Sequence, residues 1–405
     1  MLINYLKIAI AVFRRRKFFS FISLFGICFT LAMILVLAAV LDTVLLKNYP
    51  DAKRSRCLYI KGIYEKGATS FNGGSLSRYF IDHYLYSLKQ PEKIAVVSMQ
   101  SATYSYFNDR KVSFESRSVN AAYWDIMDFT FLEGKCFTAT QERLGERVAV
   151  IGESLRKDYF GNTTAVGKYI EMNRQRYRVV GVVKQAPGFG YYFSGNFFIP
   201  LSLDYVTQST SFYGNYYAIL MATSATAVTA MQNEFDAMAK RIPPSNRPYA
   251  SVVVCKAQSY SDSLIETVND IDGFWLLWGS VGIFVLLIMA LPAINMVNIN
   301  ITRIMERSSE IGVRKAFGAS RVTLAGQFLV ENLLLTLLGG LAGIVVAWLV
   351  LLYINQTNVF EYTALTIDFT VLLTAFFTCL VFGFISGVYP AWRMSRMQVA
   401  KALKG

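Results

Sequence analysis

The side chains that most often carry out enzyme chemistry are scarce in this sequence and lie far apart. His83 is the only histidine, and no pair of cysteines lies near it, so the sequence predicts no zinc site. Outside the most apolar stretches lie Cys57, Cys136 and Cys255. Their odd number and wide spacing indicate neither a disulfide framework nor a metal cluster. No serine or cysteine has an evident general base, and we therefore predict a chain that is not an enzyme and holds no cofactor or metal.

One segment has part of a nucleotide-binding motif. GNTTAVGKYI, residues 161–170, contains a glycine followed by Gly-Lys, as a phosphate-binding loop does. However, Val166 stands where the second glycine of such a loop is needed, and Tyr169 replaces the Ser or Thr that binds magnesium. We predict that this chain does not hydrolyse ATP.

Ionic recognition of another protein is the chemistry that the sequence does favour. The segment ERSSEIGVRKAFGASR, residues 306–321, carries both signs of charge and lies between two very apolar stretches. Ile311 and Val313 are too few for a core of its own, and Gly312 and Gly318 weaken an isolated helix. We predict a short helix that is stable when docked on a protein partner. The alternative is a solvated loop.

The apolar stretch 324–354 contains one acidic residue and no basic one, and the acidic residue is Glu331. A charge inside a membrane costs a few kcal/mol unless it is paired or hydrated, so such residues often have a function. Glu331 lies about two helical turns from the end of the stretch. We expect it to pair with Arg303 or Arg321 near the membrane surface, and a proton-relay role is the alternative.

Three glycines in the same stretch, Gly339, Gly340 and Gly343, form a small-xxx-small pattern. Small residues at this spacing allow the backbones of two membrane helices to approach closely. The pattern therefore predicts close helix packing, either within the chain or across a dimer.

The elements that position these residues are long apolar blocks. The chain is 54% hydrophobic, and its apolar residues come in runs long enough to cross the roughly 30 Å hydrocarbon core of a membrane. The first run is too long for the apolar part of a signal peptide and has no cleavage site after it, so we expect an uncleaved anchor. The predicted transmembrane helices are 18–41, 274–298, 324–354 and 369–392.

The basic residues predict how these helices are oriented. Lys and Arg are concentrated in 1–17, 299–323 and 393–405, whereas the short loop 355–368 has none. By the positive-inside rule, the three basic segments and both termini are cytoplasmic. Much of the net charge of +13 is therefore a topology signal that faces anionic lipid, and we expect no nucleic-acid partner. Asn4, Lys7, Ala11 and Arg14 form one narrow stripe that is polar apart from the small Ala11. The stripe predicts an amphipathic helix at the membrane surface over 1–17, or an extension of the first span.

Residues 42–273 must then form an extracytoplasmic domain. This segment is nearly balanced in charge, with 26 basic and 22 acidic residues. Val-rich runs at 147–152 and 176–184 predict strands, and SYFNDRKVSF predicts a hairpin around positions 108–109. Residues 75–90 and 226–242 have helical patterns that end at prolines. The predicted fold class is a membrane protein with four transmembrane helices, both termini inside, and a large α+β extracytoplasmic domain between helices 1 and 2.

The aromatic-rich run GFGYYFSGNFFIPLSLDY, residues 188–205, has two interpretations. We expect a core strand with ordinary turns, and a binding surface is the alternative.

Several motifs together resemble one family. ERSSEIGVRKAFGASR is similar to the Arg-Glu-Ile-Gly-x-Arg-Lys-Ala-x-Gly-Ala segment that follows the second span of FtsX-like/MacB-type ABC transporter permeases. QFLVENLLLTLLGGLAGIVVAW resembles their third span, and GVYPAWRMSRMQVAKALKG resembles their ending. RVAVIGESLRKDYFGNTTAVGKYIEMNRQRYRVVGVVK, residues 147–184, resembles their MacB-like periplasmic core domain. One departure is Ser308-Ser309, where the family frequently has an arginine.

The resemblance implies a coupling role for the charged segment. Such permeases work as dimers, homo- or heterodimeric, above two ATP-binding subunits that bind the ATP and magnesium. Because only 17 residues precede the first span, we expect the ATPase on a separate chain. The residues implied in contact with it are Glu306, Arg307, Glu310, Ile311, Gly312, Arg314, Lys315 and Gly318.

The functional hypothesis is a permease subunit in a bacterial inner membrane. It would pass movement from the ATPase to its periplasmic domain (mechanotransmission) and so drive export or extraction of a peptide, antimicrobial, lipid or lipoprotein. A periplasmic adaptor or an outer-membrane channel would be further partners. The first alternative is an FtsX-like signalling subunit that activates a cell-wall hydrolase without transport. A membrane sensor without an ATPase is the second alternative, and the coupling segment disfavours it.

Overall fold

The structure of the protein is a computed structural model. It describes residues 17–43, 49–67, 71–107, 110–161, 163–188, 190–204, 210–244, 252–264, 273–306, 313, 317, 320–357 and 365–395. The chain forms two compact units, which are described separately below. One comprises the long helices, and the other comprises Leu45–Leu276 with Phe360–Thr363. The predicted surface helix over 1–17 lies almost entirely outside the described residues.

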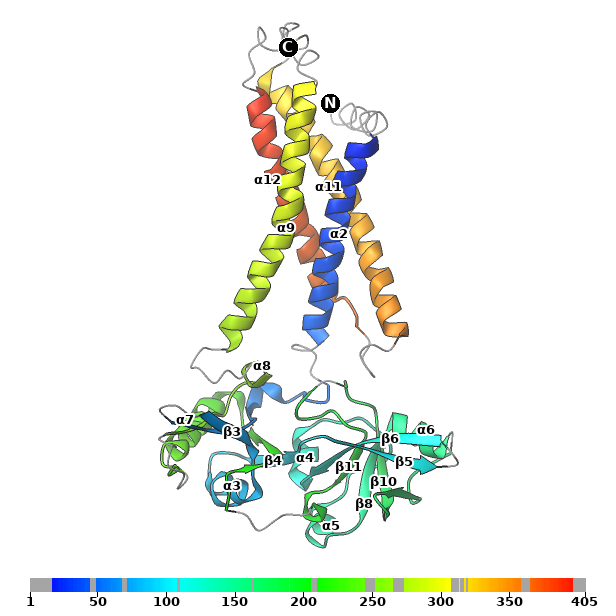
Figure 1. Cartoon of the computed structure of the whole chain (residues 1–405), viewed down its shortest axis with the longest axis vertical. Coiled ribbons are helices and arrows are strands. Elements are labelled where there is room, and N and C mark those ends of the chain that lie inside the picture. Colours follow the sequence, from blue (N-terminus) through cyan, green and yellow to red (C-terminus); the bar gives the residue numbers. More distant parts are fainter. Residues whose placement is uncertain are drawn as a thin grey trace. The chain divides into compact units, whose positions relative to one another are not determined.

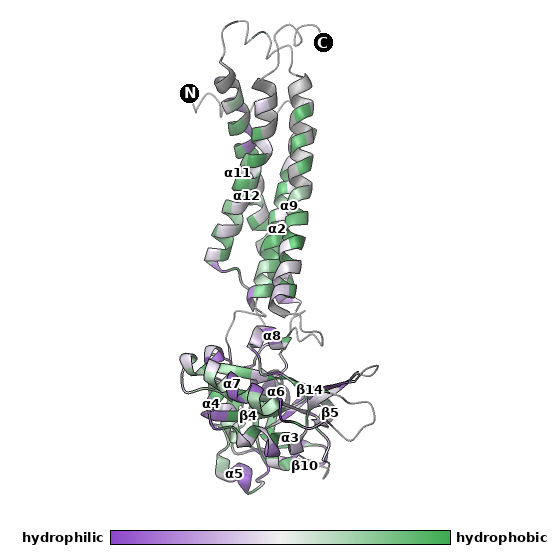
Figure 2. Cartoon of the chain, turned by 90° about the vertical axis from the view of Figure 1, so that its left-hand side faces the viewer, coloured by the Kyte–Doolittle hydropathy of each residue, from purple (hydrophilic) through white to green (hydrophobic). Residues whose placement is uncertain are grey.

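The described residues of the first unit form four long helices (Figure 1). They are α2 (Lys17–Leu41), α9 (Gly273–Glu306), α11 (Arg321–Gln356) and α12 (Phe369–Ser395). Figure 2 shows that apolar residues dominate their described lengths. Three stretches are long and apolar enough to cross a membrane, namely Ser20–Leu41, Ala325–Gln356 and Phe369–Val388. In α9 the described apolar stretch, Trp275–Ala290, is shorter, so the second predicted span stays a prediction.

The glycines of α11 show how the helices pack. Gly339 lies against Ile27 of α2, and Gly343 lies against Cys28 and Leu31. Residue numbers thus increase together on the two helices, which run parallel. On the other side Gly340 contacts Phe376 of α12, and α12 runs antiparallel.

These directions, together with the path of α9 in Figure 1, place four helix ends at one end of the bundle. They are the start of α2, the end of α9, the start of α11 and the end of α12. The predicted basic segments adjoin these four ends, in agreement with the common side that the positive-inside rule gives them.

The second unit is built on a mixed sheet. Its described strands form a 14-stranded sheet with the order β14-β2-β3-β13-β4-β6-β11-β8-β10-β7, and β1, β12, β5 and β9 pair beside this path. The strands are β1 (Cys57–Ile60), β2 (Ile63–Lys66), β3 (Phe71–Leu76), β4 (Lys93–Ser98), β5 (Ser101–Phe107), β6 (Arg110–Val119), β7 (Phe131–Gly134), β8 (Val148–Gly152), β9 (Tyr169–Met172), β10 (Gln175–Val183), β11 (Phe197–Pro200), β12 (Tyr213–Gly214), β13 (Tyr216–Met221) and β14 (Val252–Cys255).

Short helices connect these strands. They are α3 (Arg78–His83), α4 (Ala121–Ile126), α5 (Ala139–Arg143), α6 (Glu153–Phe160), α7 (Val228–Ala239) and α8 (Tyr260–Leu264), with 3-10 turns at η2 (Arg54–Arg56), η3 (Leu85–Ser87), η4 (Leu201–Leu203) and η5 (Ala225–Ala227). The pairs β8–β10 and β6–β11 are parallel, and the other pairs are antiparallel. Parallel pairing of β8 and β10 requires a crossover, and α6 and β9 lie in it.

Most local predictions for this domain are confirmed. The Val-rich runs are β8 and β10, whose buried side chains include Val150, Val179 and Val182. The hairpin is formed by β5 and β6, with Phe107 opposite Arg110. The helix predicted over 226–242 is α7, preceded by η5.

The helix predicted over 75–90 is wrong in extent. Ser75 and Leu76 belong to β3, α3 covers only Arg78–His83, and η3 follows it. The Ser77 hydroxyl caps α3 by accepting a hydrogen bond from the Phe80 N–H at 3.0 Å. Pairing of β3 with β12 and β13 holds its last residues in the sheet, and this tertiary constraint overrides the local helical pattern.

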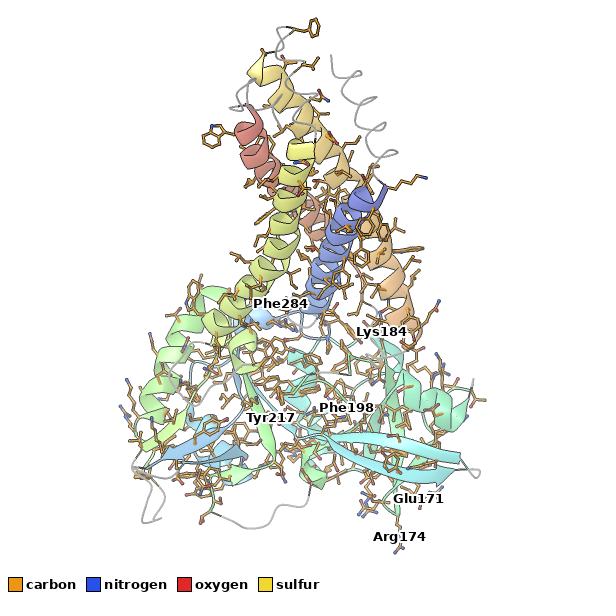
Figure 3. The ribbon with its side chains drawn as sticks, turned by 45° about the horizontal axis from the view of Figure 1, so that its top comes forward. Glu171, Arg174, Lys184, Phe198, Tyr217 and Phe284 are labelled. Carbon is orange, nitrogen blue, oxygen red and sulfur yellow. The ribbon has the colours of Figure 1, made fainter. Side chains whose placement is uncertain are left out.

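The aromatic run is core, as expected. Tyr192, Phe193, Phe197 and Phe198 are buried. Figure 3 shows Phe198 and Tyr217 within the domain, whereas Arg174 projects from the β9–β10 turn. The buried guanidinium of Arg117 holds this run in place. It donates hydrogen bonds to the backbone oxygens of Ser194, Tyr191 and Gly190 and to the Ser194 hydroxyl.

Candidate functional site

The predicted coupling segment is only partly described. Glu306 is the last residue of α9, whereas Arg307, Glu310, Ile311, Gly312, Arg314, Lys315 and Gly318 lie outside the described residues. The segment ends where the Ser320 hydroxyl accepts a hydrogen bond from the Thr323 N–H at 3.1 Å and so caps α11. The predicted coupling segment is therefore the short connection between the end of α9 at Glu306 and the start of α11 at Arg321.

Two described residues within this connection add a feature that the sequence analysis missed. The Phe317 N–H donates a hydrogen bond to the Val313 carbonyl at 3.0 Å, which is the spacing of one helical turn. Both side chains are exposed, Phe317 to 89%. Residues four apart lie on one helix face, so Val313 and Phe317 form a small exposed apolar patch beside the predicted charges. The i, i+4 spacing of these two apolar residues is the signal for the patch in the sequence.

Glu331 lies in a layer of buried polar side chains in the bundle. It is 3% exposed, and its buried neighbours on α11 are Gln327, Asn332 and Thr336. Two glycines of α12 allow close approach, because a methyl group on Gly387 would lie 2.5 Å from Asn332 Nδ2, and one on Gly383 would lie 2.2 Å from Thr336 Oγ1. Ser386 of α12 is also buried, as are Ser20 and Ser23 of α2. We name this set of residues the polar layer: Ser20, Ser23, Gln327, Glu331, Asn332, Thr336 and Ser386.

Burial changes the expectation for Glu331 only in part. Its carboxylate lies inside the bundle and not on the bundle surface. The bundle interior is where an ionisable side chain in a membrane is expected to bind other polar groups. Pairing with Arg303 or Arg321 involves side chains outside the described set, so both the ionic and the proton-relay interpretations stay predictions.

The three glycines predicted to pack helices lie against other helices of the same chain. A methyl group on Gly343 would lie 2.8 Å from the Cys28 carbonyl oxygen, and one on Gly339 would lie 2.9 Å from Ile27 Cβ. Leu31 and Leu35 of α2 and Ala347 of α11 are buried together beside them. Gly339, Gly340 and Gly343 therefore hold α11 between α2 and α12.

Other helix surfaces are open. On α9, the described side chains are largely exposed, including Trp275, Ile283 and Leu286, and Met289 is buried. A methyl group on Gly279 or Gly282 of α9 would meet no atom of the chain within 4 Å. Along α2, Phe21, Phe25 and Phe29 form an exposed row whose ring centroids are 6.1 and 6.0 Å apart.

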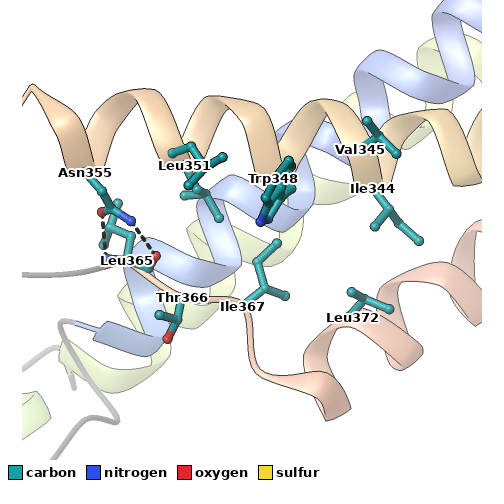
Figure 4. Close-up of a pocket in the computed structure, with 10 residues that line it drawn as sticks. Ile344, Val345, Trp348, Leu351, Asn355, Leu365, Thr366, Ile367 and Leu372 are labelled. Atoms are coloured by element: carbon teal, nitrogen blue, oxygen red, sulfur yellow. Dashed lines mark hydrogen bonds between the residues drawn. The ribbon is translucent and has the colours of Figure 1, made fainter.

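The end of α11 and the chain before α12 enclose an apolar pocket of about 480 Å³ (Figure 4). It is lined by Ile344, Val345, Trp348, Leu351, Leu352, Asn355, Leu365, Thr366, Ile367 and Leu372. Among these residues, Asn355 ties α11 to the chain before α12. Its amide group donates to the Leu365 carbonyl at 3.0 Å and accepts from the Leu365 N–H at 2.9 Å. The pocket lies in the membrane-helix unit and has no ionisable lining residue.

The described cysteines form no disulfide, and His83 contacts a backbone carbonyl of its own helix. The described cysteines Cys28, Cys57, Cys136, Cys255 and Cys379 are free thiols. Burial raises the pKa of Cys57 to about 12, so this thiol is unreactive at neutral pH. Nδ1 of His83 lies 2.9 Å from the Tyr79 carbonyl oxygen. Within the described ranges, no group of three or more His, Cys, Asp or Glu side chains could hold a metal ion.

Long helices apolar enough to cross a membrane, together with a large α/β domain, define the chain as a membrane protein, and sequence profiles identify its family. The profile of the MacB-like periplasmic core domain matches residues 20–238, and that of the FtsX-like permease C-terminal matches residues 282–399. The first covers more than half of the chain. The protein therefore belongs to the MacB/FtsX-type family of ABC transporter permeases.

Curated relatives agree with this assignment. The chain is 23% identical to the uncharacterized ABC transporter permease YknZ of Bacillus subtilis, over 85% of each sequence. It is 27% identical to the pyoverdine export ATP-binding/permease protein PvdT of Pseudomonas aeruginosa, over 70% of this chain and 41% of that protein. It is 26% identical to the macrolide export ATP-binding/permease protein MacB of Mannheimia succiniciproducens, over 76% and 46%. The chain thus spans less than half the length of PvdT and MacB.

Solved structures of external domains are also similar. The extracellular domain of YknZ has 19% identity and a TM-score of 0.37, over 49% of this chain and 98% of that one. The periplasmic region of MacB from Actinobacillus actinomycetemcomitans has 14% identity and a TM-score of 0.37, over 56% and 98%.

Proposed function

We propose that this chain is the permease subunit of an ABC transporter and couples ATP hydrolysis by a separate subunit to movement of its external domain. The observation that carries this proposal is the pair of family matches, which together span the external domain and the helices that follow it. YknZ, which aligns with this chain over most of both lengths, is named as a permease alone. This supports placing the ATPase on another chain, which would also bind the ATP and magnesium.

The ATP-binding subunit docks on the connection between α9 and α11. The exposed patch of Val313 and Phe317 supports this role, because an apolar pair beside charges is typical of the core and rim of a protein interface. Glu310 and Arg314, four residues apart, supply charges of both signs on the same short segment.

Movement passes through the bundle as mechanotransmission. The connection joins α9 to α11, and α11 is held between α2 and α12 by close glycine contacts. Interfaces this close transmit displacement, because packed cores resist compression. We infer that α2, α11 and α12 move together when the ATPase subunits approach each other.

A second permease chain, identical or related, covers part of the open helix surface. The exposed apolar residues of α9 and its open glycines, Gly279 and Gly282, support this inference, since small residues favour association of membrane helices. Lipid covers the remaining surface.

The proposed location is a bacterial inner membrane, and the proposed cargo is a peptide, antimicrobial, lipid or lipoprotein. Relatives named for pyoverdine and macrolide export support an export role. A periplasmic adaptor or outer-membrane channel would complete the path. Signalling to a cell-wall hydrolase is the alternative, and the proteins that copurify with the chain distinguish the two.

A charge exchange tests the coupling role. Glu310→Lys combined with Arg314→Glu should abolish copurification of the ATP-binding subunit, because both signs of charge at the contact are reversed. The measurement is the amount of ATPase recovered with the tagged permease from solubilised membranes.

A matched control exists on α6. Glu153→Lys combined with Lys157→Glu makes the same exchange at the same spacing, in an exposed pair of the external domain whose N–O distance is 3.2 Å. The control should retain the ATPase. Equal recovery with both double variants would contradict the coupling role, and recovery of a hydrolase in place of an adaptor or channel would favour signalling.

A further inference from the structure

The chain enters and leaves the external domain through two segments that are about 200 residues apart in sequence. We call Tyr49–Arg56 the incoming segment, because it follows α2, and Gln258–Ser263 the outgoing segment, because it precedes α9. Both segments bind to Tyr59 of strand β1. The Tyr59 N–H donates to the Gln258 carbonyl at 2.8 Å, and the Gln258 N–H donates to the Tyr59 carbonyl at 3.0 Å.

Polar side chains complete this junction. Asp51 is fully buried, and its Oδ2 accepts hydrogen bonds from the Tyr59 hydroxyl at 2.5 Å and from Arg54 Nε at 3.1 Å. The Arg54 guanidinium lies 3.7 Å from the ring centroid of Tyr260, in cation–π geometry. The rings of Tyr59 and Tyr260 are 5.4 Å apart. Incoming, outgoing and core residues therefore share one network.

The incoming segment also contacts the rest of the domain along its whole length. The Tyr49 hydroxyl donates to the Lys184 carbonyl at 2.8 Å, beyond the end of β10. Lys53 Nζ donates to the Asp125 carbonyl at 2.5 Å, in α4. Arg56 donates to the Ala222 carbonyl at 2.7 Å, beyond the end of β13, and pairs with Glu92 at 2.7 Å. A flexible link would not need so many directional contacts.

The chemistry of the junction favours a defined geometry over simple stability. Burial raises the pKa of Asp51, against the opposing effects of the Tyr59 hydrogen bond and Arg54, so the charged form is costly to bury. An apolar cluster would hold two segments together without this cost, whereas the hydrogen bond to buried Asp51 also fixes the orientation of Arg54, whose guanidinium faces Tyr260 of the outgoing segment.

We propose that Asp51, Arg54, Tyr59 and Tyr260 lock the incoming and outgoing segments into one mount, so that displacement of α2 and α9 moves the external domain as a body. The proposal rests on the proposed function, because it assigns these residues a positioning role in mechanotransmission. Without the mount, the links before and after the domain would absorb the movement.

If the mount joins the two segments, a substitution in either segment should speed hydrogen exchange in both. The measurement is hydrogen exchange of backbone amides in the full-length chain in lipid nanodiscs, without the ATPase. Arg54→Ser should speed exchange about tenfold in the outgoing segment as well as in its own, and Tyr260→Leu should do the same in the incoming segment. Strand β4 should be unaffected in both variants. Loosening confined to the substituted segment in both variants would overturn the proposal.

Two further variants serve as controls. Tyr260→Phe keeps the ring that faces Arg54 and should exchange like the wild type, which separates loss of the contact from general damage. Arg78→Ser removes an arginine from an exposed pair with Asp82, whose Nε–Oδ2 distance is 3.0 Å, and should not affect either segment. If Arg54→Ser fails to fold, the pair Tyr260→Leu and Tyr260→Phe still decides the outcome.

ATP-driven export by the reconstituted complex then separates this proposal from the proposed function. Tyr260→Leu should retain ATP hydrolysis and lose most of the export, whereas Tyr260→Phe should retain both. Full export by Tyr260→Leu, together with loss of export by the Glu310→Lys and Arg314→Glu variant, would refute the mount and leave the coupling role intact. Full export by both would refute the proposed function.

Discussion

At the scale of single residues, three buried ionisable side chains serve different structural purposes. Arg117 holds the aromatic run, Asp51 holds Arg54 and Tyr59 at the junction of the incoming and outgoing segments, and Glu331 lies among the polar layer of the bundle. Each is buried. The partners of Arg117 are mostly far away in sequence, whereas those of Asp51 are Arg54 and Tyr59, three and eight residues away. Arg117 has its pKa lowered by desolvation, and its hydrogen bonds to the run offset that cost.

Glu331→Gln distinguishes the two interpretations of this carboxylate. The amide keeps the size of the side chain, removes its charge and replaces one acceptor oxygen with a donor, so we expect a thermal midpoint within about 3 °C of the wild type and retained ATP-driven export. Glu331→Leu should lower stability by about 1–3 kcal/mol, because it leaves polar neighbours unsatisfied. Tryptophan fluorescence during heating and an export assay measure these effects. Loss of export with an intact fold in Glu331→Gln would support a proton relay.

At the scale of elements, glycines set how closely the membrane helices approach. On α11, Gly339 and Gly343 contact α2 and Gly340 contacts α12, whereas a methyl group on Gly326 would meet no atom of the chain within 4 Å. On α12, Gly383 and Gly387 accommodate Thr336 and Asn332 of the polar layer. Along α11, a glycine therefore either allows close approach of another helix, as at Gly343, or faces open space, as at Gly326.

Gly343→Ala and Gly326→Ala should change stability in opposite directions. The added methyl group at position 343 would meet the Cys28 backbone at 2.8 Å, and overpacking of this kind costs about 1–3 kcal/mol. At position 326 the methyl group meets nothing, and alanine is favoured over glycine in a helix by about 0.5–1 kcal/mol. Thermal unfolding in one detergent provides the comparison. A lower midpoint for Gly326→Ala than for Gly343→Ala would refute the described packing of α11 on α2.

At the scale of the whole molecule, the topology decides which partners each part can reach. The proposed ATPase contact requires the connection between α9 and α11 to face the cytoplasm, and the proposed mount requires the external domain to lie on the other side. Both requirements follow from the same distribution of basic residues.

Thiol labelling in right-side-out vesicles tests this topology. Ser309→Cys should react with a membrane-impermeant maleimide only after the vesicles are opened, whereas Thr140→Cys on exposed α5 should react at once. Background is low after Cys136→Ser, because the domain's other cysteines, Cys57 and Cys255, are buried. Labelling of Ser309→Cys in sealed vesicles would exclude contact with a cytoplasmic ATPase.

The local elements were predictable because the interactions that form them are local. Runs of apolar residues predicted the spans that α2, α11 and α12 contain, and Val-rich runs predicted β8 and β10. The β5–β6 hairpin was predictable from its turn. The helix over 75–90 was mispredicted, because its first residues are held by strands more than 100 residues away in sequence.

Hydropathy, charge and motif spacing are properties of neighbouring residues, and they were enough to predict the family, the spans in α2, α11 and α12, and a charged connection after α9. The packing of whole elements is needed to show that the glycines of α11 face helices of the same chain, that Arg117 holds the aromatic run, and that Arg54 meets Tyr260. These contacts join positions tens to hundreds of residues apart. Their geometry depends on how whole elements pack, and no short window of sequence contains that information.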